Sequence, residues 1–354
     1  MNYYIGEHLT ESRTAGSKAR DDISAILKSH GWEPLTIRHV FADPTIRDTR
    51  SAFFKVRENL KIRKEWSGLF KTPGAGDTVL IQFPVMRRPA LLSKILHRFR
   101  KRGGRIILVI HDLELFRYVK RKESGSLRRI WITYEEKSVL QEADHIIVHN
   151  EKMRETMIRM GTDPKKMIPL RIFDYLAEAK KENKNQETAH DVAIAGYLAP
   201  HKAGYLYQLP SNVQFSLYGR GYEDKGETNI RYYGSFHPDE LPFVINAKYG
   251  LVWDGDSADT CTGIYGEYLK INNPHKTSLY LAAGIPVIIW SQAAMGDFIR
   301  EKRCGLTVDS LSELREKIDG ISPEEYQSMK GHAESVGDQI RKGEYTLKAL
   351  SKAV

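Results

Sequence analysis

Cysteine is scarce in this sequence. Its 354 residues include only Cys261 and Cys304, too few for a disulfide framework or for a metal site built from several thiolates. No cluster of histidines and cysteines has the spacing of a zinc site. We therefore expect a protein of a reducing, cytoplasmic compartment that holds no metal ion.

Long apolar runs are absent as well. No stretch approaches the roughly 18 to 20 apolar residues that a membrane-spanning helix needs. The first residues, MNYYIGEHLTESR, lack the basic start and the apolar centre of a secretory signal. These absences predict a chain that does not cross a bilayer and does not enter the secretory route.

Positive charge is plentiful but unevenly distributed. Residues 1–190 hold 37 lysines and arginines against 24 acidic residues, whereas residues 191–354 hold 17 against 21. In the densest basic stretch, 86–105, apolar side chains recur at helical spacing opposite basic ones. The apolar residues are Leu91, Leu92, Ile95, Leu96 and Phe99, and the basic ones are Arg88, Lys94, Arg98 and Lys101. Such a helix could lie peripherally on a membrane or contact a polyanion; we favour one that covers a sheet and turns its basic side to water. The motifs of nucleic-acid binders are missing, so no nucleic-acid partner is expected.

Short apolar runs alternate with longer amphipathic segments along the whole chain. The runs are 78–83, 105–110, 145–150, 191–196, 213–219, 249–255 and 286–290. Uninterrupted apolar strands separated by helices are typical of parallel sheets. The sequence predicts an α/β protein with two Rossmann-like, doubly wound domains that face a cleft. We place the domains at 1–175 and 191–333, the polar linker at 176–190, and a terminal helix at 334–354 that could pack back on the first domain.

Ligands of open α/β sheets bind beyond the carboxyl ends of the strands, so the residues there are candidates for a site. Gly196 follows the first strand of the second domain and allows a tight turn toward a helix whose N-terminus could bind a phosphate. An ordinary strand-to-helix turn explains this glycine equally well. Tyr218 and Gly219 end the next strand, where the tyrosine could stack on a base or cap the core.

The stretch NNPHKTSLYLAAGIPVIIW, residues 272–290, predicts a short helix that ends at Gly284 and leads into a strand. Lys276 would lie at the start of that helix, where a cation opposes the helix dipole. An anionic ligand would offset this cost. The segment therefore indicates half of a pyrophosphate site, with Thr277 and Ser278 in the first turn.

Asp254 and Asp256, in WDGD, match an Asp-x-Asp motif in which two carboxylates can hold a divalent cation. A match of three residues arises easily by chance, and we expect no metal there.

The chain resembles GT-B glycosyltransferases. The resemblance is carried by NNPHKTSLYLAAGIPVI, with YYGSFHPDELP, GLVWDG, IAGYL, TAGSKARDDI and LVIHDLELFR, and it covers nearly the whole chain. The chain is similar to the branch of this class that contains bacterial galactofuranosyltransferases and the glucosyltransferases that extend sugars on serine-rich adhesins. This implies a UDP-sugar donor on the C-terminal domain, an acceptor on the N-terminal domain, and no cofactor beyond the donor itself.

The resemblance also implies roles for individual residues. Those expected at the donor are Gly196, Tyr197, Tyr218, Gly219, Tyr233, Asn273, Lys276, Thr277 and Ser278, with Arg171 as a second cation on the leaving diphosphate. Gly16, Ser17 and Lys18 are expected near the acceptor, although Lys18 could equally be solvated. The sequence departs from the wider superfamily because it lacks a Glu-x7-Glu pair before Lys276; Glu267 and Asn272 occupy that neighbourhood.

Two points of function stay open at this level. His111 or Asp112, at the end of the strand 105–110, could be the general base that activates an acceptor hydroxyl, or the pair could only anchor the strand end. The expected activity is transfer of galactofuranose, glucose or galactose from UDP to a glycan or glycosylated protein, with inversion. A non-catalytic glycoprotein-binding subunit and a UDP-sugar epimerase remain alternatives, and a homo-oligomer is expected by analogy.

Overall fold

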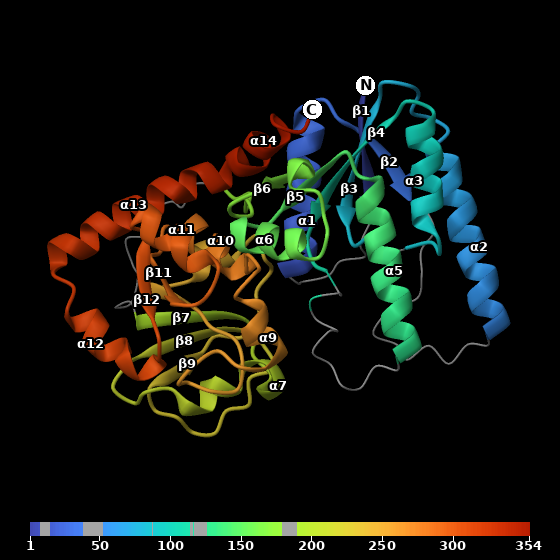
Figure 1. Cartoon of the computed structure of the whole chain (residues 1–354). Coiled ribbons are helices and arrows are strands. Elements are labelled where there is room, and N and C mark those ends of the chain that lie inside the picture. Colours follow the sequence, from blue (N-terminus) through green and yellow to red (C-terminus); the bar gives the residue numbers. More distant parts are fainter. Residues whose placement is uncertain (8–14, 38–51, 87, 114–115, 117–125, 179–189) are drawn as a thin grey trace.

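The computed structural model describes residues 1–7, 15–37, 52–86, 88–113, 116, 126–178 and 190–354 (Figure 1). The expected linker is described only at 176–178 and at His190; its remaining residues lie outside the described part. Gly16, Ser17 and Lys18 are described, whereas Thr14 at the start of TAGSKARDDI is not.

The first sheet has six parallel strands in the order β2-β1-β3-β4-β5-β6. They are β1 (Asn2–Glu7), β2 (Glu33–Ile37), β3 (Thr78–Phe83), β4 (Arg105–Ile110), β5 (His145–Val148) and β6 (Met167–Pro169). Its helices are α1 (Ala15–Ser29), α2 (Ala52–Leu69), α3 (Leu92–Lys101), α5 (Ser126–Glu142) and α6 (Glu151–Arg159), followed by the turn η1 (Pro164–Lys166). Strand order reverses at β1, which lies between β2 and β3.

The second sheet also has six parallel strands, in the order β12-β11-β10-β7-β8-β9. They are β7 (His190–Tyr197), β8 (Phe215–Arg220), β9 (Ile230–Tyr232), β10 (Ala247–Val252), β11 (Val287–Trp290) and β12 (Gly305–Val308). The helices are α7 (Pro200–Ala203), η2 (Gly204–Gln208), α8 (Leu241–Val244), α9 (Gly263–Tyr268), α10 (His275–Ala282), α11 (Met295–Lys302), η3 (Leu311–Glu313), α12 (Leu314–Asp319), α13 (Pro323–Arg341) and α14 (Glu344–Leu350). Because the order runs both ways from the β7–β10 pair, this is the doubly wound Rossmann arrangement.

The prediction of two doubly wound α/β units is confirmed. Every residue of TVLIQF in β3 is buried, as is every residue of VIIW in β11, because helices cover both faces of a parallel sheet. The run predicted at 145–150 is shorter in the structure: β5 ends at Val148, and Asn150 caps α6 by accepting from the Met153 backbone N–H.

The basic stretch forms α3, and its apolar side is not available to a membrane. Leu92, Ile95, Leu96 and Phe99 are buried, and Phe99 packs edge-on against Phe70 with ring centroids 5.3 Å apart. The interpretation of a helix that covers a sheet is therefore confirmed, and any contact of α3 with a membrane would involve its basic side alone. Among the helices that the described residues form, none is long and apolar enough to cross a membrane.

The two units share an apolar core through one side of the first sheet. Ile23 and Leu27 of α1 belong to the same cluster as Phe173, Tyr175 and the second sheet, whereas the outer face of the first sheet has a cluster of its own. Near the C-terminus, α13 runs from the second unit toward the first and α14 lies beside α1 (Figure 1). The two units are thus joined by a packed interface as well as by the chain.

Candidate functional site

Lys276 lies in the first turn of α10, over the carboxyl end of β10. Its Nζ donates to the backbone oxygen of Trp253 at 2.7 Å and to Oδ1 of Asp254 at 3.0 Å, and its side chain is 16% exposed. Pro274 precedes α10, and no side chain in the described part of the chain caps the helix. A helix N-terminus without a side-chain cap, next to an ammonium group, favours an anionic ligand.

Gly196 lies across from this helix, where β7 and β10 part. The two strands pair as far as Ala193 and Gly250 and no further. Gly196 has φ +135°, and a Cβ at this position would meet no heavy atom within 4 Å, so its backbone borders open space. Gly219 supports it from β8: a Cβ there would lie 1.7 Å from the Gly196 oxygen, so only glycine allows this approach.

The tyrosines near these glycines differ in accessibility. Tyr197 is 50% exposed, whereas Tyr218 is 1% exposed and stacks on Tyr233 with centroids 5.0 Å apart and planes at 5°. The Tyr218 hydroxyl accepts from the Asn246 backbone N–H, and burial raises its pKa. Tyr218 therefore caps the core, and the expectation that it stacks on a base is corrected. Tyr233 is half-buried, with the Arg231 guanidinium 5.0 Å from its ring.

Asn273 faces the other unit instead of an open pocket. Its Nδ2 donates to the backbone oxygens of His149 at 2.7 Å and Arg171 at 3.1 Å, while its Oδ1 accepts from Asn150 at 2.7 Å. Its backbone N–H donates to Nδ1 of His149 at 2.9 Å. With 5% exposure and these partners, Asn273 joins the carboxyl edges of the two sheets, which corrects the expectation of a contact with the donor sugar.

Thr277 and Ser278 are buried in the same interface. The Ser278 hydroxyl donates to the Phe173 backbone oxygen at 2.7 Å, and the Thr277 hydroxyl oxygen is buried without a hydrogen-bond partner among the described residues. Their side chains are thus turned away from solvent. What α10 offers a ligand is Lys276 and the backbone of its first turn.

His111 follows β4, and its hydrogen bond to Gln82 defines which ring nitrogen carries the proton. Its Nε2 lies 2.7 Å from Oε1 of Gln82, and the Gln82 amide nitrogen donates to the Arg20 oxygen and to Ser24 Oγ. Gln82 Oε1 is therefore the acceptor, so His111 carries its proton on Nε2 and keeps Nδ1 basic. Burial lowers the pKa of His111, with Arg20, His149 and His275 adding to the effect. A neutral, oriented imidazole is suited to general-base catalysis.

Asp112 lies beside His111 in a different environment. Both Asp112 and Glu7 act electrostatically on the buried Arg20 guanidinium, whose pKa is lowered mainly by desolvation. Arg20 also donates to the Gln82 backbone oxygen at 3.1 Å. The carboxylate thus balances a buried cation, which favours the anchoring alternative for Asp112 and leaves the basic nitrogen to His111.

Arg171 is paired within the interface. It is a non-glycine residue at φ +77°, its guanidinium forms an ion pair with Glu301 of α11, and its carbon Cζ lies 5.7 Å from the Phe298 ring centroid. The structure does not bring this side chain together with Lys276. Its backbone oxygen instead accepts from Asn273.

Lys18 is a buried link between the units. Its Nζ contacts Oδ1 of Asp22 at 2.6 Å, Oδ1 of Asp239 at 2.8 Å and the Leu176 oxygen at 2.7 Å. The ammonium has three protons, so these partners use its donor capacity. Both expectations for Lys18, an acceptor contact and a solvated residue, are corrected. Ser17 beside it is 6% exposed, and Gly16 lies one residue earlier in α1.

The Asp-x-Asp motif is used for internal contacts. Asp254 pairs with Lys276, and the Asp256 carboxylate accepts a hydrogen bond from the Thr262 hydroxyl. Within the described ranges, no group of three or more His, Cys, Asp or Glu side chains is arranged to hold a metal ion.

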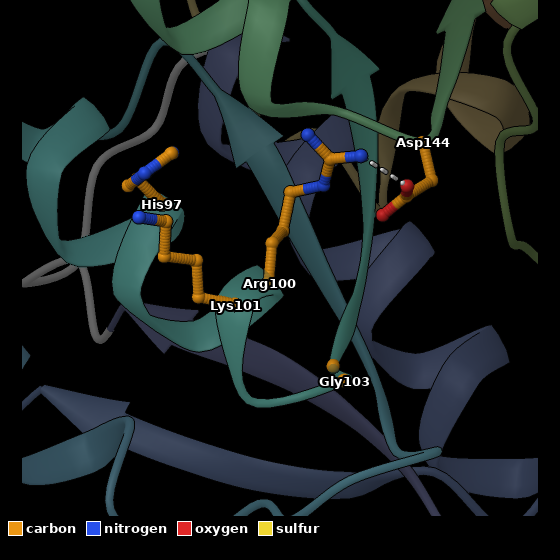
Figure 2. A pocket seen from close by; sticks show the side chains of 6 residues that line it. His97, Arg100, Lys101, Gly103 and Asp144 are labelled. Atoms are coloured by element: carbon orange, nitrogen blue, oxygen red, sulfur yellow. Dashed lines mark hydrogen bonds and ion pairs between the residues drawn. The ribbon is translucent and has the colours of Figure 1, made fainter.

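A shallow hollow lies at the opposite edge of the first sheet (Figure 2). It is lined by His97, Arg100, Lys101, Gly103, Gly104 and Asp144, next to the first residues of β4 and β5. Arg100 pairs with Asp144 at 3.0 Å. Ligands of such sheets bind at carboxyl ends, so we place the functional site at Lys276 and Gly196 and not in this hollow.

The sequence does not indicate the roles of several residues at this site. The Trp253 oxygen and Asp254 hold Lys276, and Tyr280 of α10 contacts β7. His149 was also missed, although the polar pair directly after the run HIIV could have drawn attention to it. Asp254 was noticed only as a possible metal ligand, because nothing in the sequence showed that Lys276 lies beside it.

Two Rossmann-like units are joined at their carboxyl edges, with a cation at the switch point of the second, and this is the arrangement expected of the GT-B class. The family model described as "Glucosyltransferase 3-like, N-terminal domain" matches residues 2–172, and "Glucosyltransferase 3-like, C-terminal domain" matches residues 192–353. The chain is 35% identical over 283 residues to the β-1,6-galactofuranosyltransferase WbbI of Escherichia coli (strain K12). The aligned residues cover 78% of this chain and 79% of that protein.

Two further relatives extend the comparison. Glucosyltransferase 3 of Streptococcus gordonii is 25% identical over 341 residues, covering 95% of this chain and 93% of that protein. Sucrose-phosphate synthase from Thermosynechococcus elongatus shares the fold with a TM-score of 0.56 at 14% identity, over 98% of this chain and 94% of that chain.

The chain belongs to the glucosyltransferase 3-like family and is a hexosyl-transferring GT-B glycosyltransferase. The predicted resemblance and enzyme class are thereby confirmed. The alternatives of a non-catalytic binding subunit and of an epimerase are set aside, because the matching family and the two curated relatives named above are transferases.

Proposed function

We propose that the enzyme transfers a hexosyl unit from a UDP-hexose and that the diphosphate binds between Gly196 and the first turn of α10. The observation that carries this proposal is the Lys276 ammonium, held over the carboxyl end of β10 by Trp253 and Asp254. Negative charge develops on the departing UDP during transfer, and a fixed cation beside a helix N-terminus stabilises it. No metal or further cofactor enters this scheme.

UDP-galactofuranose is the donor that we propose first. The galactofuranosyltransferase relative is 35% identical, against 25% for the glucosyltransferase of Streptococcus gordonii. UDP-glucose and UDP-galactose are the next donors to compare. These sugars differ in ring size or in one hydroxyl, and a hydrogen-bonding site discriminates strongly against a missing partner.

The acceptor is proposed to be a glycan or a glycosylated protein on the N-terminal domain, 1–175, with the donor on 191–333. His111 would remove the proton of the attacking hydroxyl through Nδ1, with inversion at the anomeric carbon. Gly16 and Ser17, at the start of α1, remain the proposed acceptor contacts. We further propose that the enzyme is cytoplasmic, forms a homo-oligomer and contacts the membrane peripherally. No nucleic acid takes part in this scheme.

UDP release from a panel of UDP-sugars, with and without acceptor glycans, tests the activity. Lys276→Ala is expected to reduce kcat/KM about 10²- to 10³-fold, as for loss of one preorganised donor to a developing charge. Lys330→Ala is the matched control, because Lys330 is an exposed lysine 3.9 Å from Glu334 on α13. If the wild-type protein neither binds UDP nor releases it from any donor, the proposal fails.

A further inference from the structure

We propose that Tyr280 is a positioning residue for the donor: its hydroxyl fixes the end of β7 relative to Lys276. This rests on the proposed function, since it concerns how the two halves of the diphosphate site are held together. Tyr280 lies within the stretch 272–290, but the sequence gives it no role of its own.

Tyr280 and Lys276 lie on the same side of α10. They are four residues apart, and side chains at i and i+4 share one face of a helix. Lys276 reaches the carboxyl end of β10, while the Tyr280 ring is fully buried beneath it and its hydroxyl accepts from the Ala195 backbone N–H at 2.7 Å. One helix face therefore contacts both central strands of the second sheet.

The Ala195 N–H needs this partner because the strands part at that point. Pairing between β7 and β10 ends at Ala193 and Gly250, so β10 offers no acceptor two residues later. A buried amide without an acceptor is costly. The phenol fills the position that a neighbouring strand occupies elsewhere in the sheet.

Gly250 makes room for the ring. A Cβ at this position would lie 2.1 Å from Tyr280 Cγ, closer than any real contact, and Gly250 does not have a positive φ. A glycine within a strand often marks a close approach of another group. Here the approaching group is the tyrosine that lies against β10.

The hydrogen bond to Ala195 also fixes the position of the next residue, Gly196. Gly196 borders the open space at the strand end, and the peptide that precedes it is tied to α10. The distance between the Gly196 backbone and the Lys276 ammonium is thus set through Tyr280. Since a small misplacement of groups that orient a substrate can cost a large part of the rate, loss of the hydroxyl is expected to act on turnover.

The test compares Tyr280→Phe with Tyr326→Phe. Tyr326 of α13 also bonds through its hydroxyl to a strand backbone, the Lys248 oxygen at 3.1 Å, but at the amino end of β10. Tyr280→Phe is expected to lower kcat about tenfold at saturating donor and to weaken UDP binding severalfold, with the acceptor KM unchanged. Tyr326→Phe is expected to leave all three within twofold.

Gly250→Ala is a second variant, which moves the same ring without removing its hydroxyl. It should also lower kcat and leave the acceptor KM unchanged. Rates are compared at a temperature at which circular dichroism shows each variant folded. Should neither variant fold, hydrogen exchange of wild-type peptides that contain Ala195 is measured with and without UDP, and a severalfold slowing by UDP is expected.

The outcomes separate this inference from the proposed function. If the wild-type enzyme transfers sugar and Tyr280→Phe matches it in kcat and UDP affinity, the role of Tyr280 is overturned while the proposed function stands. Hydrogen exchange at Ala195 that UDP leaves unchanged would also overturn the role of Tyr280. A wild-type protein that neither binds UDP nor turns over removes the proposed function itself.

Discussion

The Lys276 ammonium and the Asp254 carboxylate lie 3.0 Å apart at the carboxyl end of β10. Both side chains are largely buried, with 16% and 11% exposure, so the pair is screened less than a surface ion pair. The ammonium also donates to the Trp253 oxygen. The carboxylate therefore positions the cation while it places a negative charge beside the proposed diphosphate.

Asp254→Asn is expected to tighten UDP binding about fivefold. The amide oxygen can still accept from Lys276, and the Trp253 oxygen stays in place, but the repulsion between carboxylate and diphosphate is removed. We take about 1 kcal/mol for this term, and 1.4 kcal/mol corresponds to tenfold in affinity. Isothermal titration with UDP measures it. Asp256→Asn serves as the control, and equal or weaker UDP binding by Asp254→Asn would contradict the prediction.

His111→Asn is expected to lower kcat by about 10² to 10⁴ with little change in UDP affinity, because general-base catalysis contributes about that much. Burial lowers the pKa of His111 below 6.5, so the imidazole stays neutral and active down to a pH below that value. The acid limb of the wild-type kcat/KM profile should therefore lie below pH 6.5. His97→Asn, at an exposed histidine next to Glu142, is the control; an acid limb above pH 6.5 would count against His111.

The fold was predictable because its signal is local. Apolar runs such as RIILVI and PVIIW need only burial on both faces to become parallel strands, and Gly284 and Pro286 mark the end of the helix before β11. The position of Lys276 at a helix start also followed from its neighbours in sequence. The helical spacing of apolar residues also predicted which side of α3 faces the sheet.

The partners of the site residues were less predictable, because they are distant in sequence. Asn273 bonds to His149 and Arg171, and Lys18 bonds to Leu176 and Asp239. Whether a polar side chain faces a ligand or the other unit depends on how the two units meet. No spacing within a single segment carries that information, so these residues were expected at the ligand and lie in the interface.

Asp174 makes the interface sensitive to pH. Its carboxylate accepts from the backbone N–H groups of Tyr345 and Thr346 at the start of α14, and burial raises its pKa to about 7. Since the unfolded value is near 3.9, the folded state binds the proton more tightly. Stability from this group is therefore greatest at low pH and declines as pH rises from about 4 to 7.

The size of this effect follows from about three pKa units at 1.36 kcal/mol each, or about 4 kcal/mol. Urea unfolding at pH 5 and pH 8 should show that the difference in unfolding free energy between wild type and Asp174→Asn changes by about 3 kcal/mol, because asparagine does not titrate and about two of the three pKa units lie above pH 5. The comparison with the variant is needed because the buried His111, His149 and His275, whose pKa values are lowered, change the wild-type stability in the opposite direction over the same range. Asp297→Asn, at an exposed carboxylate paired with Arg300, should retain the wild-type slope. A slope unchanged in Asp174→Asn would show that Asp174 is not the titrating group.

Asn273→Ala is expected to destabilise the joint between the units more than it affects UDP binding. The change removes the amide that serves the His149 and Arg171 oxygens and the Asn150 side chain. Leaving a buried polar group without its partner costs about 1 to 3 kcal/mol, so urea unfolding should show a loss of that order or more. Asn59→Ala is a control, because its carbonyl bonds only one backbone N–H among the described contacts, that of Ala90. If Asn273 instead contacted the donor sugar, Asn273→Ala would raise the donor KM at nearly unchanged stability; the structure predicts the reverse, because every polar atom of this side chain is already bonded within the protein.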